Sequence, residues 1–134
     1  MSENRDILAC IPQRPPFVLI DTIEQQSEKE THTRYTIPED CPLLSNGILP
    51  LSGLMENAAQ TSSVIAGNKI AFIGAVKQME VTRFPQIGET LCTKAVVVQQ
   101  MLNILLIECT TYAQDEIIAT AMLKIAIIGE DATR

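Results

Sequence analysis

The sequence offers little from which a metal site or a nucleic-acid surface could be built. It contains a single histidine, His32, and its four cysteines are scattered without a C-x-x-C pair. A zinc site made of cysteine and histidine ligands is therefore not expected. Acidic residues outnumber basic ones by 16 to 10, and the net charge of −6 argues against nucleic acid as a partner. We expect neither a metal nor a cofactor.

Long apolar segments are absent as well. No apolar run approaches the roughly 20 residues of a membrane-spanning helix. The charged opening MSENRDILAC lacks the apolar core of a signal peptide. The sequence therefore predicts a cytoplasmic protein without a membrane partner. In such a reducing compartment the cysteines are expected to stay as thiols; these are Cys10, Cys41, Cys92 and Cys109.

What is present is the composition of a folded domain. Hydrophobic residues make up 46% and charged residues 19% of the chain, which argues against intrinsic disorder. No internal repeat and no linker-like segment interrupts it. A chain of 134 residues can bury a sizeable core, so we expect one domain over residues 1–134.

The stretch LPLSGLMENAAQTSSVIAG, residues 49–67, has the pattern of the one long helix. Pro50 suits a first helical turn, and Gly67 followed by Asn68 is a typical stop, so the helix is predicted over about 50–66. Its apolar face consists of Leu51, Leu54, Met55, Ala58, Ala59, Ile65 and Ala66. A second stripe is polar and is either solvated or part of a site; it consists of Ser52, Glu56, Gln60 and Ser63.

Six stretches rich in apolar and β-branched residues predict strands. They span residues 17–26, 30–37, 69–82, 89–100, 104–113 and 117–128. A loop at 38–47 leads into the helix, a short helical turn is expected over 5–11, and the tail 129–134 is expected to fray. Further turns are expected at 84–88, Asn103 and 115–116. A run of strands with one helix indicates an α+β domain with an antiparallel sheet.

Several of these strands are apolar on both faces, at residues 96–98, 104–107 and 125–128. One face of such a sheet can pack against the helix. The other face needs cover too, which a partner subunit could supply.

Three segments resemble the β-hydroxyacyl-acyl-carrier-protein dehydratases of the hot-dog fold, and together the resemblance covers about residues 11–128. IPQRPPFVLID, residues 11–21, is similar to that family's L-P-H-R-x-P-F-L-L-V-D, with Gln13 where a histidine is usual. NGILP, residues 46–50, followed by ENAAQ, residues 56–60, is similar to N-P-I-M-P-G-x-x-x-x-E-A-x-A-Q. The third segment, RFPQIGETL at residues 83–91, is similar to F-x-x-P-V-x-P-G-D-x-L.

The resemblance implies a hot-dog fold, in which a curved antiparallel sheet of about six strands wraps around one long central helix. It also implies a dimer whose sheets join edge to edge, with an apolar acyl tunnel where the helix of one subunit meets a loop of the other. The implied partners are acyl carrier protein or coenzyme A thioesters of fatty-acid or polyketide-type metabolism. The implied substrate-binding positions are Asn46, Gly47, Leu51, Gln60 and Arg83.

Dehydration of a β-hydroxyacyl thioester needs a group that takes the α-proton and one that protonates the leaving hydroxyl. The family uses a carboxylate on the helix, which corresponds to Glu56, and a histidine in the preceding loop. That histidine position is Pro42 here, and proline has no side-chain base. His32 lies too far upstream, in a predicted strand, where exposure at the surface is expected.

Three hypotheses follow. In the first, the chain is a dehydratase-like protein that binds acyl thioesters and has weak or absent lyase activity. It then forms a homodimer, or it pairs with an active hot-dog subunit and does no chemistry itself. Alternatively, it is a thioesterase in which Glu56 acts with the amides of the helix N-terminus. Alternatively, it is a dehydratase with another acid, such as Cys41. Glu56 could also be an ordinary surface residue that pairs with Gln60. Arg83 is either a solvated residue at a strand end or a contact for the acidic helix or the phosphate of a carrier.

Overall fold

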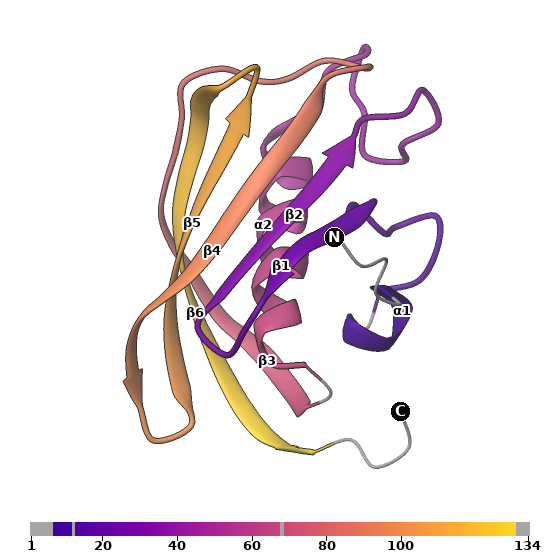
Figure 1. Ribbon diagram of the computed structural model, residues 1–134. Helices are drawn as coiled ribbons and strands as arrows, with labels where there is room; N and C mark the ends of the chain where they lie inside the picture. Colours follow the sequence, from indigo (N-terminus) through magenta and orange to yellow (C-terminus); the bar gives the residue numbers. More distant parts are fainter. Residues whose placement is uncertain (1–6, 12, 68, 131–134) are drawn as a thin grey trace.

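A computed structural model describes residues 7–11, 13–67 and 69–130. Its six strands form one antiparallel sheet in the order β1-β2-β4-β5-β6-β3. The elements are α1 (Ile7–Cys10), β1 (Thr22–Gln26), β2 (Glu30–Thr36), α2 (Leu51–Ile65), β3 (Lys69–Val81), β4 (Thr90–Met101), β5 (Ile104–Ala113) and β6 (Glu116–Glu130). Figure 1 shows the sheet curving around α2, which confirms the hot-dog fold.

The curvature of the sheet has a visible cause in β3. Its pairing with β6 shifts register at three places, between Ile70 and Ala71, between Ile73 and Ala75, and between Lys77 and Glu80. The extra residue belongs to β6 at the first place and to β3 at the other two, and each extra residue bends its strand and increases the twist. The sheet contacts α2 mainly through β2 to β6. Strand β1 also reaches the helix, since Gln26 Nε2 donates to Val64 O at 2.9 Å.

Helix α2 has the predicted position within one residue at each end. Pro50 is its N-cap in an extended conformation, Ala66 is its C-cap, and Gly67 follows with φ +64°, a conformation that glycine adopts without strain. Asn68, the second part of the predicted stop, lies outside the described residues. At 15 residues the helix is only about 22 Å long, so it is moderate in length.

The first predicted strand is too long at its start, since β1 begins at Thr22 and not at residue 17. The peptide groups of Leu19 explain the difference. Its N–H donates to Gln60 Oε1 at 2.8 Å, and its C=O accepts from Asn57 Nδ2 at 2.8 Å. Segment 17–20 is thus held by side chains of α2 in place of a neighbouring strand.

Other boundaries differ by a few residues. The turn predicted at 115–116 consists of Gln114 and Asp115, both with positive φ, so β6 starts at Glu116 and continues to Glu130. The short helical turn predicted over 5–11 is α1, and Arg5 lies outside the described residues, as does most of the predicted tail, 131–134.

The layer between α2 and the sheet contains a hydrogen-bonded polar belt as well as apolar side chains. Thr33 Oγ1 and Thr61 Oγ1 are 2.8 Å apart, Thr61 Oγ1 donates to Asn57 O at 2.8 Å, and Thr93 Oγ1 donates to Asn57 Oδ1 at 2.6 Å. All four side chains are buried. Buried polar groups are costly unless they are paired. Any shift of α2 on the sheet would break these bonds, so they favour one position of the helix.

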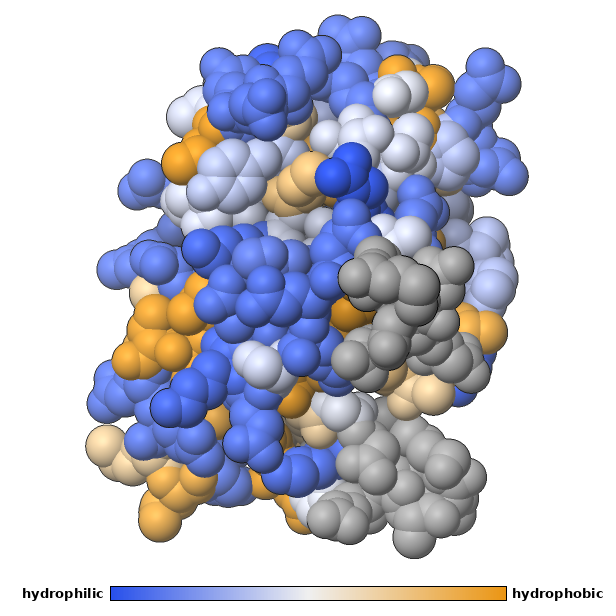
Figure 2. All heavy atoms as spheres, viewed as in Figure 1, coloured by the Kyte–Doolittle hydropathy of each residue, from blue (hydrophilic) through white to orange (hydrophobic). Residues whose placement is uncertain are grey.

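The outer face of the sheet is mixed. Figure 2 shows hydrophobic patches within a largely hydrophilic surface. Large apolar residues exposed on the molecule include Phe72, Val98, Met101, Leu102 and Ile128. The sequence predicts that a partner subunit covers the outer face at residues 96–98, 104–107 and 125–128, and this stays a prediction.

Candidate functional site

Glu56 lies in the second turn of α2, half-buried, at an open cleft of about 390 Å³. Met55 and Ala59 of α2 line one wall and Ile73 and Val76 of β3 line another. The remaining lining residues are Gln13 and Ser52. Glu56 is the one ionisable residue of this set, so the cleft places a single carboxylate against largely apolar walls.

Two side-chain amides hold the carboxylate through one of its oxygens. Glu56 Oε2 accepts hydrogen bonds from Gln13 Nε2 at 3.1 Å and from Gln60 Nε2 at 3.0 Å. Oε1 accepts none from any residue that the structure describes. That second oxygen is therefore the one available to a ligand in the cleft.

Gln60 is fully buried, so the solvated interpretation of the polar stripe is wrong for this residue. Its Oε1 accepts from Leu19 N at 2.8 Å and its Nε2 also donates to Phe17 O at 2.9 Å. The predicted pair with Glu56 does form. Gln60 thus joins segment 17–20 to α2 and to the carboxylate, and it is not among the residues that line the cleft.

The other predicted positions lie apart from the Glu56 cleft. Asn46 and Gly47 have positive φ and form a tight turn closed by two hydrogen bonds between Ser45 and Ile48, of 2.9 and 3.0 Å. Leu51 is exposed in the first turn of α2. None of these predicted positions belongs to the lining.

Arg83 is tied into a local ion-pair network. Its guanidinium lies 3.0 Å from a carboxylate oxygen of Glu89 and 3.3 Å from one of Glu116. The hydrogen bond from Arg83 holds the pKa of Glu89 below its usual value, against the opposing effect of burial. The same contact raises the pKa of Arg83. The network joins the loop before β4 to the start of β6 and does not line the Glu56 cleft.

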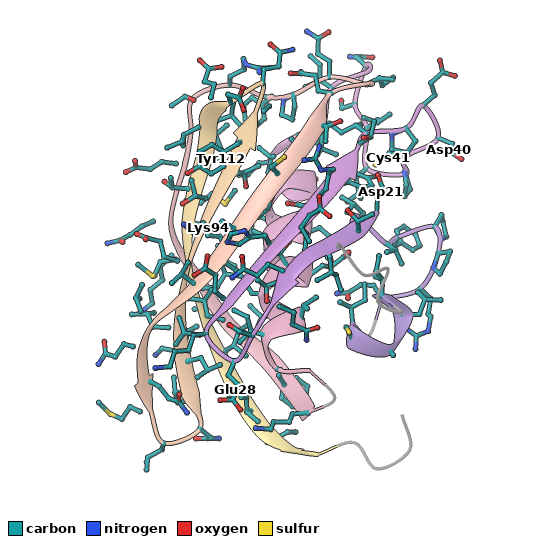
Figure 3. The ribbon with its side chains drawn as sticks, viewed as in Figure 1. Asp21, Glu28, Asp40, Cys41, Lys94 and Tyr112 are labelled. Atoms are coloured by element: carbon teal, nitrogen blue, oxygen red, sulfur yellow. The ribbon has the colours of Figure 1, made fainter. Side chains whose placement is uncertain are left out.

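The residues considered as alternative acids or bases are also elsewhere. Pro42 is exposed, and Cys41 beside it is buried against Tyr35; Figure 3 shows Cys41 in the loop between β2 and α2. His32 alternates with the buried Thr31 and Thr33 on β2, so it points away from α2, and it contacts Glu30. The chain's only histidine is therefore on the side of the sheet opposite Glu56.

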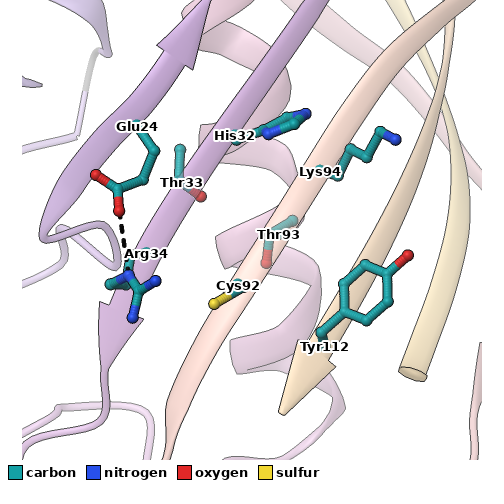
Figure 4. Close-up of a pocket in the computed structure, with 8 residues that line it drawn as sticks. All are labelled: Glu24, His32, Thr33, Arg34, Cys92, Thr93, Lys94 and Tyr112. Carbon is teal, nitrogen blue, oxygen red and sulfur yellow. Dashed lines mark hydrogen bonds and ion pairs between the residues drawn. The ribbon is translucent and has the colours of Figure 1, made fainter. Parts of the chain in front are cut away.

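A second pocket, of about 300 Å³, lies on the outer face of the sheet over β1, β2, β4 and β5. Figure 4 shows its charged and polar side chains, which are Glu24, His32, Arg34, Lys94 and Tyr112, with Cys92 among them. Its cations are already paired: Arg34 with Glu24 at 3.2 Å and Lys94 with Glu30 at 3.9 Å. The sequence interpretation missed this pocket, although the alternation in 30–36 predicts an outward-facing row.

Thiol and metal chemistry find little support in the residues that the structure describes. Burial raises the pKa of the Cys109 thiol to about 11, and its Sγ lies 3.0 Å from Ser62 Oγ. No group of three potential ligands is placed to hold a metal ion in ranges 7–11, 13–67 and 69–130. Over the same ranges, neither α1 nor α2 has the length and hydrophobicity of a transmembrane helix.

Comparisons with known proteins agree with this architecture. The chain is 23% identical over 138 residues to the 3-hydroxyacyl-[acyl-carrier-protein] dehydratase FabZ of Levilactobacillus brevis, with 94% of this chain and 93% of that protein covered. It superimposes on a chain of the dehydratase heterocomplex ApeI:P from Xenorhabdus doucetiae with a TM-score of 0.82 at 18% identity, covering 95% and 92% of the two chains. A hypothetical thioesterase protein with coenzyme A from Streptococcus pneumoniae has a TM-score of 0.72 at 12% identity, with 82% and 87% covered.

At such low identities the two structural likenesses show the shared fold alone. The family comes from a sequence model: the model of the ApeP-like family, described as ApeP dehydratase, matches residues 5–132. Because this match spans nearly the whole chain, the protein belongs to the ApeP-like family of hot-dog dehydratases.

Proposed function

We propose that this protein binds acyl thioesters in the Glu56 cleft and works as one of two paired hot-dog subunits in fatty-acid or polyketide-type metabolism. The observation that carries the proposal is the single carboxylate set against apolar walls, with one oxygen held by two amides. Apolar walls suit an acyl chain, and one fixed polar group suits the reacting end of a ligand. Neither a cofactor nor a metal is part of the proposal.

The position of the cleft favours a site shared by two subunits. Strand β3 is an edge of the sheet, 13 residues long, and it supplies the cleft residues Ile73 and Val76. The other edge, β1, has only 5 residues. Long open edges are prone to pair with another strand, so a second subunit paired along β3 would border the cleft.

A paired subunit would also supply the missing base. Elimination of water from a β-hydroxyacyl thioester needs a second acid or base besides Glu56, and His32 is on the wrong face of the sheet. A histidine from a loop of the partner subunit would complete the site. The similarity to a chain of a dehydratase heterocomplex supports a mixed pair. A cytoplasmic location and acyl-carrier or coenzyme A thioesters as ligands belong to the same proposal.

The test compares this protein alone with a co-expressed pair in which the other hot-dog subunit carries the loop histidine. We expect 3-hydroxybutyryl-pantetheine to bind to both preparations and to be dehydrated to the enoyl thioester by the mixed pair only. Ordinary dehydratase turnover by this protein alone would contradict the shared site. The absence of a mixed pair, with only homodimers formed, would contradict the paired role, and failure to bind any thioester would remove the proposal altogether.

A thioesterase is the second candidate, because the N-terminus of α2 lies beside the same cleft. The N–H groups of Gly53 and Leu54 bond to Pro50 O, which leaves those of Leu51 and Ser52 as the ones that an incoming thioester carbonyl could approach, and Ser52 lines the cleft. Helix N-terminal amides stabilise negative charge on such an oxygen. Release of free thiol from a panel of acyl-coenzyme A and acyl-carrier substrates, abolished in Glu56→Gln, would favour this activity. No thiol release from any of them would exclude it.

A subunit without chemistry of its own is the third candidate. The dehydration rate of the mixed pair separates this candidate from the first one. If this chain does no chemistry, Glu56→Gln in it would leave that rate unchanged. A large loss of rate would instead assign the carboxylate of the shared site to this chain.

A further inference from the structure

We infer that Gln13 is a positioning residue for Glu56: it holds Oε2 of the carboxylate so that Oε1 is presented to the cleft. The inference concerns how the carboxylate is held, and its consequence for turnover depends on the function proposed above. The two amides that donate to Glu56 Oε2 differ in their own surroundings.

The amide of Gln60 is oriented independently of Glu56. Its oxygen accepts from Leu19 N at 2.8 Å and its nitrogen donates to Phe17 O at 2.9 Å. If the amide were flipped, its oxygen would face Phe17 O and its nitrogen would face Leu19 N, and both contacts would be repulsive. The backbone alone therefore determines that the Gln60 nitrogen faces the carboxylate. Removal of Glu56 would leave Gln60 in place.

The amide of Gln13 has no such support. Its nitrogen donates to Glu56 Oε2 at 3.1 Å, while its oxygen is buried and has no partner among residues 7–11, 13–67 and 69–130. A buried amide oxygen without a donor is unfavourable. The orientation of Gln13 is therefore imposed by the carboxylate, which accepts the N–H and would repel the oxygen.

The backbone at Gln13, in contrast, is anchored without its side chain. Ile11 is fully buried, and Arg14 Nη1 donates to Ile11 O at 2.9 Å and to Gln13 O at 2.8 Å. Variants of the Gln13 side chain should therefore leave the segment in position. This makes Gln13 a clean site at which to change only the hydrogen bond to Glu56.

The consequence for the cleft concerns orientation. The terminal torsion of a glutamate side chain has a broad energy minimum, so a carboxylate held by Gln60 alone can swing about that contact. With Gln13 as a second donor, Oε2 is held from two sides and Oε1 keeps one direction. Misplacement of a reacting group lowers the rate more than it weakens ligand binding.

The first test needs no ligand. In NMR spectra, the side-chain NH₂ resonance of Gln13, assigned by its loss in Gln13→Met, should move upfield in Glu56→Ala, because the charged acceptor is gone. The resonance of Gln25, an exposed glutamine, should stay in place. A Gln13 resonance that does not respond to Glu56→Ala would overturn the inference.

The second test uses the mixed pair or, if hydrolysis is the activity, this protein alone. Gln13→Met keeps the volume but removes the donor, and we expect kcat to fall about tenfold with KM within about threefold. Gln13→His, which restores a ring N–H donor, should recover most of the rate, and Gln25→Met should match the native protein. Native kcat in Gln13→Met would show that Gln13 only packs, and would overturn the inference.

The two failures are distinguishable. If the native protein binds no thioester in any preparation, the proposed function fails, while the NMR response still decides whether Gln13 and Glu56 hold each other. If thioesters are turned over but Gln13→Met is indistinguishable from native, the function stands and the positioning role fails.

Discussion

The two pockets of this protein lie on opposite faces of the same sheet and differ in how their polar groups are satisfied. The outer pocket is lined by Glu24, two basic side chains and the only histidine of the sequence. Its charged groups are paired near solvent with each other or with Glu30. The Glu56 cleft has a single ionisable group, and two amides hold it. One of them, Gln60, is itself held by the backbone of Phe17 and Leu19.

The difference teaches that a concentration of titratable groups is a poor guide to a site. Exposed ion pairs contribute little and compete with any ligand for the same charges. In the Glu56 carboxylate, one oxygen accepts two hydrogen bonds, and the other accepts none from the described part of the chain and lies beside apolar walls. Because the side chain is already ordered, a ligand would bind without a further entropic cost of ordering it. The following predictions test whether the two pockets differ in this way.

Glu56→Gln should give the largest effect. The substitution keeps the volume and an oxygen that can accept from Gln13 and Gln60, so stability should change by less than about 1 kcal/mol. Dehydration by the mixed pair, or thiol release, should fall by about 10²–10⁴-fold because the acid–base group is lost. The assay is followed by enoyl absorbance or free thiol, with Glu80→Gln, an exposed residue of β3, as the matched control.

Asn57→Ala should cause the largest loss of stability. The change leaves Leu19 O and Thr93 Oγ1 without their bonds of 2.8 and 2.6 Å to Asn57. We expect a loss of about 2–4 kcal/mol in the free energy of unfolding, measured by urea denaturation. Asn103→Ala, which removes one exposed bond of 2.8 Å to Ile127 O, should cost less than about 1 kcal/mol. Equal losses in both variants would mean that the belt does not hold α2.

Arg83→Gln should have a smaller effect that depends on pH. The pKa of Glu89 lies below its ordinary value of 4.5 because Arg83 donates to it. The contact therefore stabilises the protein above about pH 4.5, and this contribution is lost as the pH falls through the lowered pKa. The difference in Tm between native and variant should be greatest near neutral pH and disappear on acidification.

Thioester affinity measured on the Arg83 variant sharpens the same comparison. The sequence interpretation made Arg83 a candidate for binding a carrier or its phosphate. If the ion-pair network is only structural, the affinity for acyl-pantetheine stays unchanged while Tm falls. A loss of affinity for acyl-carrier substrates, with affinity for acyl-pantetheine preserved, would restore the carrier role.

Changes in the outer pocket should have the smallest effects. Lys94→Gln and Arg34→Gln remove exposed charges whose ion pairs measure 3.9 and 3.2 Å. Stability should change by less than about 0.5 kcal/mol, and turnover should match that of the native protein. Loss of turnover in either variant would make the outer pocket part of the site, and the two pockets would then not differ in function.

The sequence predicted the elements well because their signals are local. The period of apolar residues in 50–66 and the stop at Gly67 predict α2 within one residue. Alternation predicts β2 almost to the residue, and a run of apolar and β-branched residues predicts β5. The predicted start of β1 was wrong because only the approach of Gln60 and Asn57 decides that Leu19 pairs with side chains of α2 and not with a strand. The family motif directed attention to Glu56, but not to Gln13 as its partner.

The sequence by itself determined the order of strands and helix, the stripe that contains Glu56 and Gln60, and the absence of a base at Pro42. Only the tertiary structure decided that Gln60 is buried, that His32 faces outward, and that Gln13 lies against Glu56 from 43 residues away. The physical reason is that periodicity reports which residues share a face, whereas a hydrogen bond between distant segments depends on how curved layers pack. That packing depends on the bulges of β3 and on the polar belt beneath α2.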